Sequence, residues 1–236
     1  MKAFLLAAGR GTRLRPLTNT VPKCLLPIRG TPLLAIWLEL CAQAGIDSVL
    51  INVHAHANAV KQFLGSRRLP VSIEIVEEDE LLGSAGTIAA NRSWITGEPN
   101  FFILYGDVLT NADLKSLQCY HDHNHEVATL GLYRVSDPSR CGVVTLNEAG
   151  IITNFEEKPA MPVSNLVFSG IMIARNEFMN WLPNAVPADI GYHVLPQLTG
   201  RIAGYELRDY VKDIGTVQTY EEVQQNWPGL QQEQRC

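Results

Sequence analysis

The stretch that decides the fold reads AFLLAAGRGTRLRPLT over residues 3–18 and, two residues later, VPKCLLP over residues 21–27. Its apolar beginning predicts a buried strand near 2–7 that opens into a loop. Gly9 and Gly11 allow the backbone of this loop to approach an oxyanion closely and to aim N–H groups at it. The stretch therefore predicts a strand that ends in a phosphate-binding loop.

Three polar side chains extend this interpretation from a phosphate to a nucleoside triphosphate. Thr12 adds a hydroxyl donor, and Arg13 and Lys23 add positive charge close to the glycines. A charge of this size suits a strongly anionic ligand. We expect the loop to hold the phosphates of a nucleotide.

Other loop types fit the stretch less well. A dinucleotide-binding fingerprint needs a third glycine where Leu14 stands, and a Walker loop needs Gly-Lys-Ser/Thr at the start of a helix. Arg10, Arg13 and Arg15 interrupt the apolar run too early for a secretory signal. The sequence therefore predicts a cytoplasmic location.

The chain is long enough for one large domain with a substantial core. It has 236 residues, of which 46% are hydrophobic and 18% charged. Strand-like and helical patterns alternate in the first half, which predicts an α/β fold with a mostly parallel sheet. We expect strands at 2–7, 48–53, 71–76 and 100–105, and helices at 32–44, 56–65 and 84–94.

The pattern changes after about residue 125, where strand-like runs follow one another without helices between them. The expected strands are 126–134, 142–146, 150–155 and 166–174. A helix near 190–199, strand-like pieces to 213 and a Gln-rich helix and tail over 216–236 complete the chain.

Charge and cysteine content restrict the partners. The net charge of −5 and the pI near 5.7 argue against nucleic acid and anionic membranes, and no apolar run is long enough for a membrane span. The odd number of cysteines suits free thiols; they are Cys24, Cys41, Cys119, Cys141 and Cys236. We expect a small-molecule ligand, and the sequence leaves open whether the chain forms a homo-oligomer.

The order Gly-x-Gly-Thr-Arg-x-x-Pro-Leu-Thr, a short spacer and Pro-Lys resembles the N-terminal signature of the sugar-nucleotide pyrophosphorylases, or sugar-1-phosphate nucleotidylyltransferases. The resemblance is greatest to the catalytic core of the mannose-1-phosphate guanylyltransferases. It implies that an NTP and a sugar 1-phosphate react to give an NDP-sugar and pyrophosphate. It also implies a three-layer α/β/α, Rossmann-like nucleotidyltransferase domain.

The resemblance implies one domain over residues 1–236 without a C-terminal β-helix domain, since no hexapeptide repeat is present. Residues 1–125 would form the nucleotide-binding half and residues 126–236 the sugar-phosphate-binding half. Arg13 and Lys23 would be catalytic. The expected nucleotide contacts at the end of the first strand and in its loop are Leu6, Ala8, Gly9, Gly11 and Thr12.

The chemistry implied needs positive charge more than it needs a base. A sugar phosphate is already mostly dianionic at neutral pH, so the difficulty is to bring it to an anionic triphosphate. Asp107, in Tyr-Gly-Asp-Val after the strand at 100–105, resembles the family's first metal ligand, and Asp213, in Lys-Asp-Ile-Gly-Thr, resembles the second. Two carboxylates with phosphates and waters are typical of Mg²⁺. Taken alone, Asp107 could instead cap a helix or form a turn, and Asp213 could cap the helix that starts near 216 or pair with Lys212.

The segment EEDELLGSAGT over residues 77–87 resembles the Leu-Gly-Thr-Ala-Gly segment of GDP-mannose pyrophosphorylases. Gly83 and Gly86 would allow close approach of the nucleotide. A carboxylate such as Glu78 could accept from the two N–H donors of guanine, which favours GTP. An acidic turn before a helix is the alternative.

For the sugar phosphate, Glu157-Lys158-Pro159 resembles the family's Glu-Lys-Pro motif, in which the lysine pairs with the phosphate and the glutamate accepts from sugar hydroxyls. Gly142 belongs to a Cys-Gly-Val-Val strand and Gly170 to a Phe-Ser-Gly-Ile segment, and both resemble segments that line the sugar. Cys141 and Phe168 depart from the usual aromatic and Asn at their positions. A solvated charged turn is the alternative for residues 156–158.

Within this class, guanylyl transfer to mannose 1-phosphate or a heptose 1-phosphate is the preferred hypothesis. Uridylyl transfer, for example to N-acetylmuramate 1-phosphate, is the first alternative, and cytidylyl transfer to phosphocholine is the weakest. A hypothesis from another class is a non-catalytic sensor that binds an NDP-sugar. The sequence does not decide the base or the sugar.

Overall fold

The computed structural model describes residues 1–231, which form two compact units. The first unit contains Met1–Glu80, Leu104–Leu114 and residues 209–231. The second contains Leu81–Ile103 and Lys115–Arg208. Residues 232–236, with Cys236 and the end of the predicted tail, lie outside the described residues.

Three parallel strands form the centre of the first unit. They are β1 (Lys2–Leu6), β4 (Ser48–Val53) and β5 (Ser72–Glu77), with β4 paired to both of the others. The residues of β1 between Lys2 and Leu6 are fully buried, as expected for a parallel strand that is covered on both faces. The three strands run in the same direction and in aligned register, so the loops that follow them leave from one edge.

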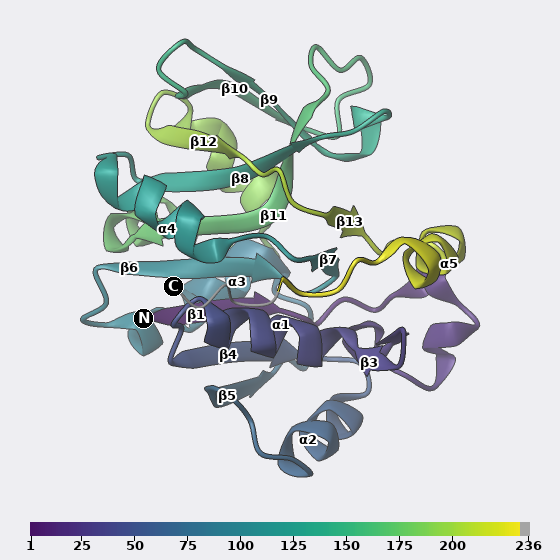
Figure 1. The fold of residues 1–236 in the computed structure, drawn as a ribbon. Helices are drawn as coiled ribbons and strands as arrows, with labels where there is room; N and C mark the ends of the chain where they lie inside the picture. The colour runs from purple at the N-terminus through teal and green to yellow at the C-terminus, as the bar shows by residue number, and fades with distance from the viewer. Residues whose placement is uncertain (232–236) are drawn as a thin grey trace. The chain divides into compact units, whose positions relative to one another are not determined.

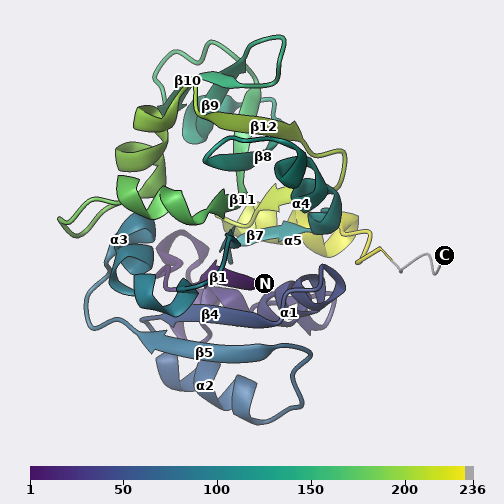
Figure 2. The ribbon, with the colours of Figure 1, turned by 90° about the vertical axis from the view of Figure 1, so that its left-hand side faces the viewer.

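Helices and short hairpins complete the first unit. The helix α1 (Leu33–Gln43) lies in front of β1 and β4 in Figure 1 and buries the apolar stripe that contains Trp37. The helix α2 (Ala57–Gly65) follows β4, and Figure 2 shows it on the outer side of β5. The remaining elements are β2 (Pro27–Ile28), β3 (Thr31–Pro32), β7 (Val108–Thr110), β13 (Val211–Asp213) and α5 (Val217–Asn226).

The second unit is built on a mixed sheet. Its strand β8 (Ala128–Arg134) pairs antiparallel with β11 (Leu166–Arg175) and parallel with β12 (Ile202–Glu206). The strands β9 (Gly142–Leu146) and β10 (Ile152–Glu157) form an antiparallel pair, and β9 meets β11 at Val143 and Val167 (Figure 1). The helices are α3 (Gly83–Ala90) and α4 (Leu114–His123), and β6 (Asn100–Tyr105) passes from this unit into the first.

The observed elements confirm the predicted α/β class, with parallel strands in the first half of the chain and a mixed sheet after it. The predicted helix at 190–199 is wrong in detail, because the chain there forms a π-helical turn, Ile190–Val194, and a 3-10 turn, Leu195–Leu198. Pro196 explains the difference, since it has no N–H to continue an α-helix and restricts the residue before it. No helix within residues 1–231 is long and apolar enough to cross a membrane.

The four described cysteines, Cys24, Cys41, Cys119 and Cys141, are free thiols. Burial raises the pKa of Cys24 and of Cys41 to about 12. A thiol with such a pKa stays protonated at neutral pH and is a poor nucleophile. These two cysteines therefore belong to the core of the first unit.

Candidate active site

The loop after β1 has the geometry that its glycines predict. Gly11 has a φ of +60°, and a side chain at this position would come within 3.0 Å of Thr18 Cγ2. The Thr18 hydroxyl donates to the Gly11 carbonyl over 2.7 Å, and this hydrogen bond holds the loop in place. Gly9, Thr12 and Arg13 are not buried. The loop therefore presents backbone and polar groups to solvent on a rigid support.

No α-helix follows this loop directly. The chain forms a 3-10 turn at Thr12–Leu14 and two more at Leu17–Asn19 and Lys23–Leu25. A dinucleotide-binding or Walker loop would continue into a helix at this point. The local structure agrees with the exclusion of both loop types from the sequence.

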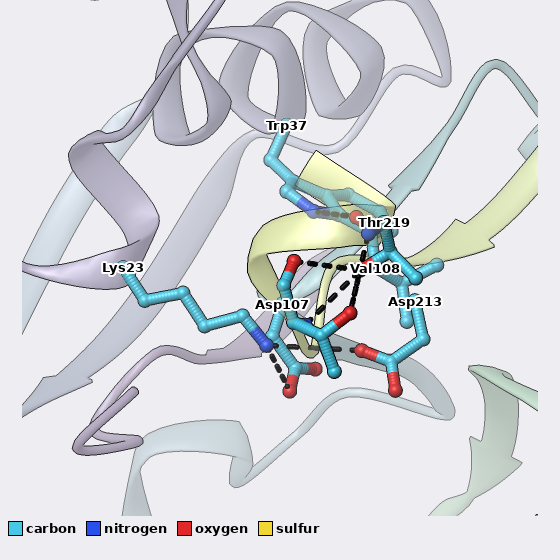
Figure 3. A network of polar contacts seen from close by, with 7 residues as sticks. Lys23, Trp37, Asp107, Val108, Asp213 and Thr219 are labelled. Carbon is cyan, nitrogen blue, oxygen red and sulfur yellow. Dashed lines mark hydrogen bonds and ion pairs between the residues drawn. The ribbon is translucent and has the colours of Figure 1, made fainter. Parts of the chain in front are cut away.

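Lys23 lies between two carboxylates. Its ammonium group is 2.9 Å from Asp107 Oδ2 and 3.7 Å from Asp213 Oδ1, as Figure 3 shows. The lysine side chain is only 8% exposed, whereas those of Asp107 and Asp213 are 47% and 56% exposed. A buried ammonium group requires anionic partners, and these two aspartates supply them.

Backbone pairing brings the two aspartates together. The strand β13 pairs antiparallel with β7, with Asp213 opposite Val108, and the Ile214 N–H donates to the Asp107 carbonyl over 3.1 Å. Figure 3 also shows Trp37, whose Nε1 donates to the Val108 carbonyl over 2.8 Å. We call Asp107 and Asp213 the carboxylate pair. Its geometry depends on strands rather than on flexible loops.

Glycines join the carboxylate pair to the loop after β1. The Gly106 N–H donates to the Leu6 carbonyl over 2.9 Å. This hydrogen bond places Asp107, the next residue, beside the end of β1. A side chain at Gly215 would be 3.2 Å from Arg13 Nη2 and 3.2 Å from Asp213 Oδ2. The guanidinium of Arg13 therefore lies close to the carboxylate pair. Gly215 was not expected from the sequence, although it belongs to the same Asp-Ile-Gly-Thr motif.

Glu78 and Asn52 form a buried polar network beneath the loop. Asn52 donates from Nδ2 to Glu78 Oε1 over 2.9 Å and accepts at Oδ1 from the Ala7 N–H over 2.8 Å. Asn52 and Glu78 are only 4% and 5% exposed. Sequence reasoning missed Asn52, and the available signal was an amide at the end of the apolar run of β4. The network connects β1, β4 and the chain after β5.

The second unit holds Glu157 and Lys158 at the end of β10. The Lys158 ammonium group is 3.3 Å from Glu157 Oε1 and 5.4 Å from the centre of the Tyr192 ring. Burial raises the pKa of Glu157, while the ammonium of Lys158 opposes this rise. Lys158 has a φ of +52°, a strained value for a residue with a side chain, and such strain is concentrated at functional sites.

Two glycines fit closely around the Glu157 carboxylate. A side chain at Gly142 would be 2.9 Å from Glu157 Oε2, and one at Gly191 would be 2.5 Å from the same atom. Gly142 lies in β9, and Gly191 lies in the π-helical turn, a structure frequent at functional sites. Gly191 and Tyr192 were not expected from the sequence, because the predicted α-helix would have placed them differently.

Gly170 lies in an irregular part of β11. The pairing with β8 shifts between Phe168 and Met172, and Gly170 has a φ of +79°. The Ser169 hydroxyl supports this bulge by donating to the Gly131 carbonyl over 2.7 Å. Bulges of this kind re-aim the strand and are common beside active sites.

Gly83 and Gly86, at the start of α3, are approached by another part of the second unit. A side chain at Gly83 would be 2.4 Å from the Ala188 carbonyl oxygen, and one at Gly86 would be 2.9 Å from Val186 Cγ1. The N–H groups of Ala85 and Gly86 donate to the Ala188 carbonyl. The two glycines allow this close packing, and their contact with a nucleotide remains a prediction.

The predicted residues thus form one cluster in each unit. The first unit holds the loop after β1 (Leu6, Ala8, Gly9, Gly11, Thr12 and Arg13) together with Lys23, Glu78, Asp107 and Asp213. The second unit holds Gly83, Gly86, Gly142, Glu157, Lys158 and Gly170. Among the described residues, no group of three or more His, Cys, Asp or Glu side chains is arranged to hold a metal.

Comparison with known proteins gives consistent matches. The family model described as "Nucleotidyl transferase" matches residues 2–228. The mannose-1-phosphate guanylyltransferase catalytic subunit beta of Xenopus tropicalis is 33% identical over 91% of this chain and 61% of its own length. The mannose-1-phosphate guanylyltransferase of Mycobacterium tuberculosis is 33% identical over 92% of this chain and 62% of its own length. The chain therefore spans about three fifths of these relatives.

Solved structures show the same fold. HddC from Yersinia pseudotuberculosis, complexed with GMP-PN, superposes with a TM-score of 0.78 and 20% identity, and the match covers 96% of this chain and 99% of that one. At this identity the likeness concerns the fold alone. It agrees with the Rossmann-like class expected from the sequence.

Proposed function

The chain belongs to the nucleotidyl transferase family, and from this premise we propose that it transfers a nucleotidyl group from an NTP to a sugar 1-phosphate. The products would be an NDP-sugar and pyrophosphate. The observation that carries the proposal is the contact of Lys23 with the carboxylate pair beside the loop after β1. This arrangement supplies positive charge, two oxygen ligands and a phosphate-binding backbone in one place.

The transfer exchanges one phosphoanhydride bond for another. A phosphate oxygen of the sugar 1-phosphate attacks the α-phosphorus of the NTP, and the bond from that phosphorus to the bridging oxygen of the β-phosphate breaks. The bond electrons leave with pyrophosphate, and no proton has to be removed from the nucleophile. The protein therefore contributes position and positive charge rather than a general base.

A divalent metal ion is general in this family, and for this chain we propose Mg²⁺. The donor set fits, because Asp107 and Asp213 offer two carboxylates at 47% and 56% exposure, and Mg²⁺ commonly takes one or two carboxylates with phosphates and waters. When bound, the ion would neutralise charge on the triphosphate and on the departing pyrophosphate.

We propose that the first unit supplies most of the nucleotide site. The loop backbone at Gly9, Gly11 and Thr12 would hold the phosphates, with Leu6 and Ala8 at its base. Arg13 and Lys23 would stabilise the charge that develops on the phosphates. Glu78 would take part in base recognition, and Gly83 and Gly86 would admit the nucleotide at the start of α3.

We propose that the second unit supplies the sugar-phosphate site. Lys158 would pair with the phosphate of the sugar, and Glu157 would accept from sugar hydroxyls. Gly142 and Gly170 would let the sugar come close to the backbone of β9 and β11. The 3.3 Å contact between Glu157 and Lys158 keeps the two groups side by side before the substrate binds.

Both relatives described above, which match at 33% identity, are named mannose-1-phosphate guanylyltransferases. On this basis we propose GTP and mannose 1-phosphate as the substrates, with a heptose 1-phosphate as the next acceptor to test.

The test is pyrophosphate release with Mg²⁺ for five NTPs against a panel of sugar 1-phosphates. We expect turnover with GTP and mannose 1-phosphate, and a loss of about a hundredfold or more in Asp107→Asn. Glu39→Gln is the control, because it removes one negative charge from an exposed position on α1 in the same unit. Nucleotide binding without turnover for any pair would contradict the proposal and favour a sensor.

A further inference from the structure

The Lys23 ammonium group lies against both members of the carboxylate pair. The ammonium contacts Asp107 Oδ2 and Asp213 Oδ1, the same kind of oxygen atoms that would bind a divalent cation. It is also the more buried partner, since the lysine side chain is 8% exposed and both aspartates are about half exposed. The buried lysine therefore needs this contact to compensate its charge more than the half-exposed carboxylates do.

The Cβ end of the Lys23 side chain is fixed by the backbone and its packing. The ammonium group is held by ion pairs. The residue begins the 3-10 turn Lys23–Leu25, and its Cβ would lie 3.3 Å from a side chain at Gly11. The four-carbon stem of a lysine allows its ammonium to move without movement of the backbone. The ammonium is thus anchored beside the phosphate-binding loop and is able to exchange one anionic partner for another.

The carboxylate pair, by contrast, is held by backbone structure. Asp107 follows Gly106, whose N–H forms a hydrogen bond to the Leu6 carbonyl. Asp213 is held by the pairing of β13 with β7. The two carboxylates would repel each other if no cation lay between them. Lys23 supplies a positive charge in contact with both carboxylates, and the Arg13 guanidinium lies close to Asp213.

From this geometry we propose that Lys23 is a resident counter-ion for the metal site. It holds the carboxylate pair together without metal and opposes the binding of a bare divalent cation, because the cation must displace it. An arriving triphosphate offers the ammonium a new anionic partner and frees the carboxylates. The inference rests on the proposed function, since it assigns the carboxylate pair to a metal ion.

The consequence is coupling between metal and nucleotide. A ligand that draws the ammonium from the carboxylates increases the affinity of the pair for the cation, and by linkage the cation increases the affinity for that ligand by the same factor. The protein without nucleotide should therefore bind divalent cations weakly. Lys23 would act as a positioning residue for the metal as well as a group that stabilises charge on the phosphates.

The test measures Mn²⁺ binding to the whole protein without nucleotide, from the loss of the electron paramagnetic resonance signal of free Mn²⁺. We expect Lys23→Met to bind Mn²⁺ at least about tenfold more tightly than the unmodified protein. Lys212→Met is the matched control, because it removes the same charge next to Asp213, and Lys212 is paired with Glu222 at 2.8 Å instead. The control should gain much less affinity than Lys23→Met.

Two further variants make the result specific. Lys23→Arg keeps the positive charge and should bind Mn²⁺ as weakly as the unmodified protein, whereas Asp107→Asn added to Lys23→Met should abolish the gain. If thermal melting shows that Lys23→Met does not fold, Lys23→Gln takes its place with the same expected gain. Equal Mn²⁺ affinity in the unmodified protein and the neutral Lys23 variant would overturn the inference.

Failure of this inference can be separated from failure of the proposed function. Turnover by the unmodified protein, with no gain of Mn²⁺ affinity in the neutral Lys23 variant, would reject the counter-ion role alone. A gain of affinity in a protein that releases no pyrophosphate for any substrate pair would support the counter-ion role and reject the proposed reaction.

Discussion

At the scale of single residues, the position of the Glu157 carboxylate depends on two glycines that have no Cβ. Gly142 and Gly191 both leave room for Glu157 Oε2, and neither position has space for a Cβ. Glu157 is 17% exposed, and its carboxylate is also in contact with Lys158. The orientation of this carboxylate is therefore set by two glycines from different elements and one ammonium group.

Gly191→Ala should weaken binding of the sugar 1-phosphate. The new Cβ would stand 2.5 Å from Glu157 Oε2, so the carboxylate must turn away. We expect the KM for the sugar 1-phosphate to rise about tenfold, with the KM for the NTP changed by less than about twofold. Steady-state kinetics with each substrate varied in turn measure both values.

Gly65→Ala is the control for this substitution, because a Cβ at Gly65 would meet nothing within 4 Å. Its two KM values should match those of the unmodified protein. Equal increases in both KM values for Gly191→Ala would indicate a general distortion and would contradict the specific role of Gly191.

Some site residues could be predicted from the sequence and others could not. The loop glycines, Lys23 and the Glu157-Lys158 pair stand in contiguous motifs, so their local pattern was sufficient to select them. Asn52 and Gly191 make their contacts with residues distant in the chain, and their neighbours in the sequence carry no motif. Only the fold reveals that Asn52 joins Ala7 to Glu78 and that Gly191 lies against Glu157.

At the scale of elements, strands were easier to predict than helix ends. The parallel strands are short runs rich in β-branched and apolar residues, and β4 has the predicted bounds, Ser48–Val53. In the predicted helix and tail over 216–236, the helical part is α5, which ends at Asn226, and Pro228 follows. The π-helical turn could not be predicted, since no simple periodicity distinguishes it from an α-helix.

The helix α5 begins directly after the Asp-Ile-Gly-Thr motif at residues 213–216 and has a complete capping box. The Thr216 hydroxyl accepts from the Thr219 N–H over 3.2 Å, and the Thr216 N–H donates to Thr219 Oγ1 over 3.0 Å. Thr216→Ala removes the side-chain half of this box. We expect the free energy of unfolding to fall by about 1 kcal/mol, measured by urea denaturation.

Thr31→Ala, at an exposed position of β3, is the comparison for the cap. It should change the free energy of unfolding by less than about 0.5 kcal/mol. If the two variants were equally stable, the cap at Thr216 would not contribute to the stability of the protein.

At the scale of the whole molecule, long-range pairing decides the chemistry. Asp107 and Asp213 are far apart in the sequence, and the pairing of β7 with β13 brings them to one ammonium group. Neither strand has more than three residues, so sequence patterns alone could not predict that they pair. The resemblance of two motifs to a family suggested the pair, and the fold accounts for their proximity.

The stability of the molecule should depend on pH through His121. This residue is fully buried on α4, its Nδ1 is 2.9 Å from Thr129 Oγ1, and Asp122, Glu126 and Arg175 are the charged groups around it. Burial, and then the charge of Arg175, lowers its pKa from 6.5 to about 4. The unfolded chain therefore takes up a proton at a higher pH than the folded protein.

The contribution of His121 is thus fully present above pH 6.5 and is lost as the pH falls toward 4. The shift corresponds to about 3 kcal/mol of unfolding free energy. His121→Asn, which can keep a bond to Thr129, should lose much of this dependence, while His125→Asn, at an exposed position on the same unit, should retain it. Urea denaturation at pH 7 and pH 4.5 would measure the difference, and the same acid loss in all three proteins would contradict the assignment.

The most direct test of the proposed reaction follows the α-phosphate itself. The protein is incubated with Mg²⁺, mannose 1-phosphate and GTP labelled at the α-phosphorus, and the products are separated. We predict that all transferred label appears in GDP-mannose, with an equal amount of unlabelled pyrophosphate. Label that appears as GMP, or that stays in GTP while the protein binds the nucleotide, would contradict it.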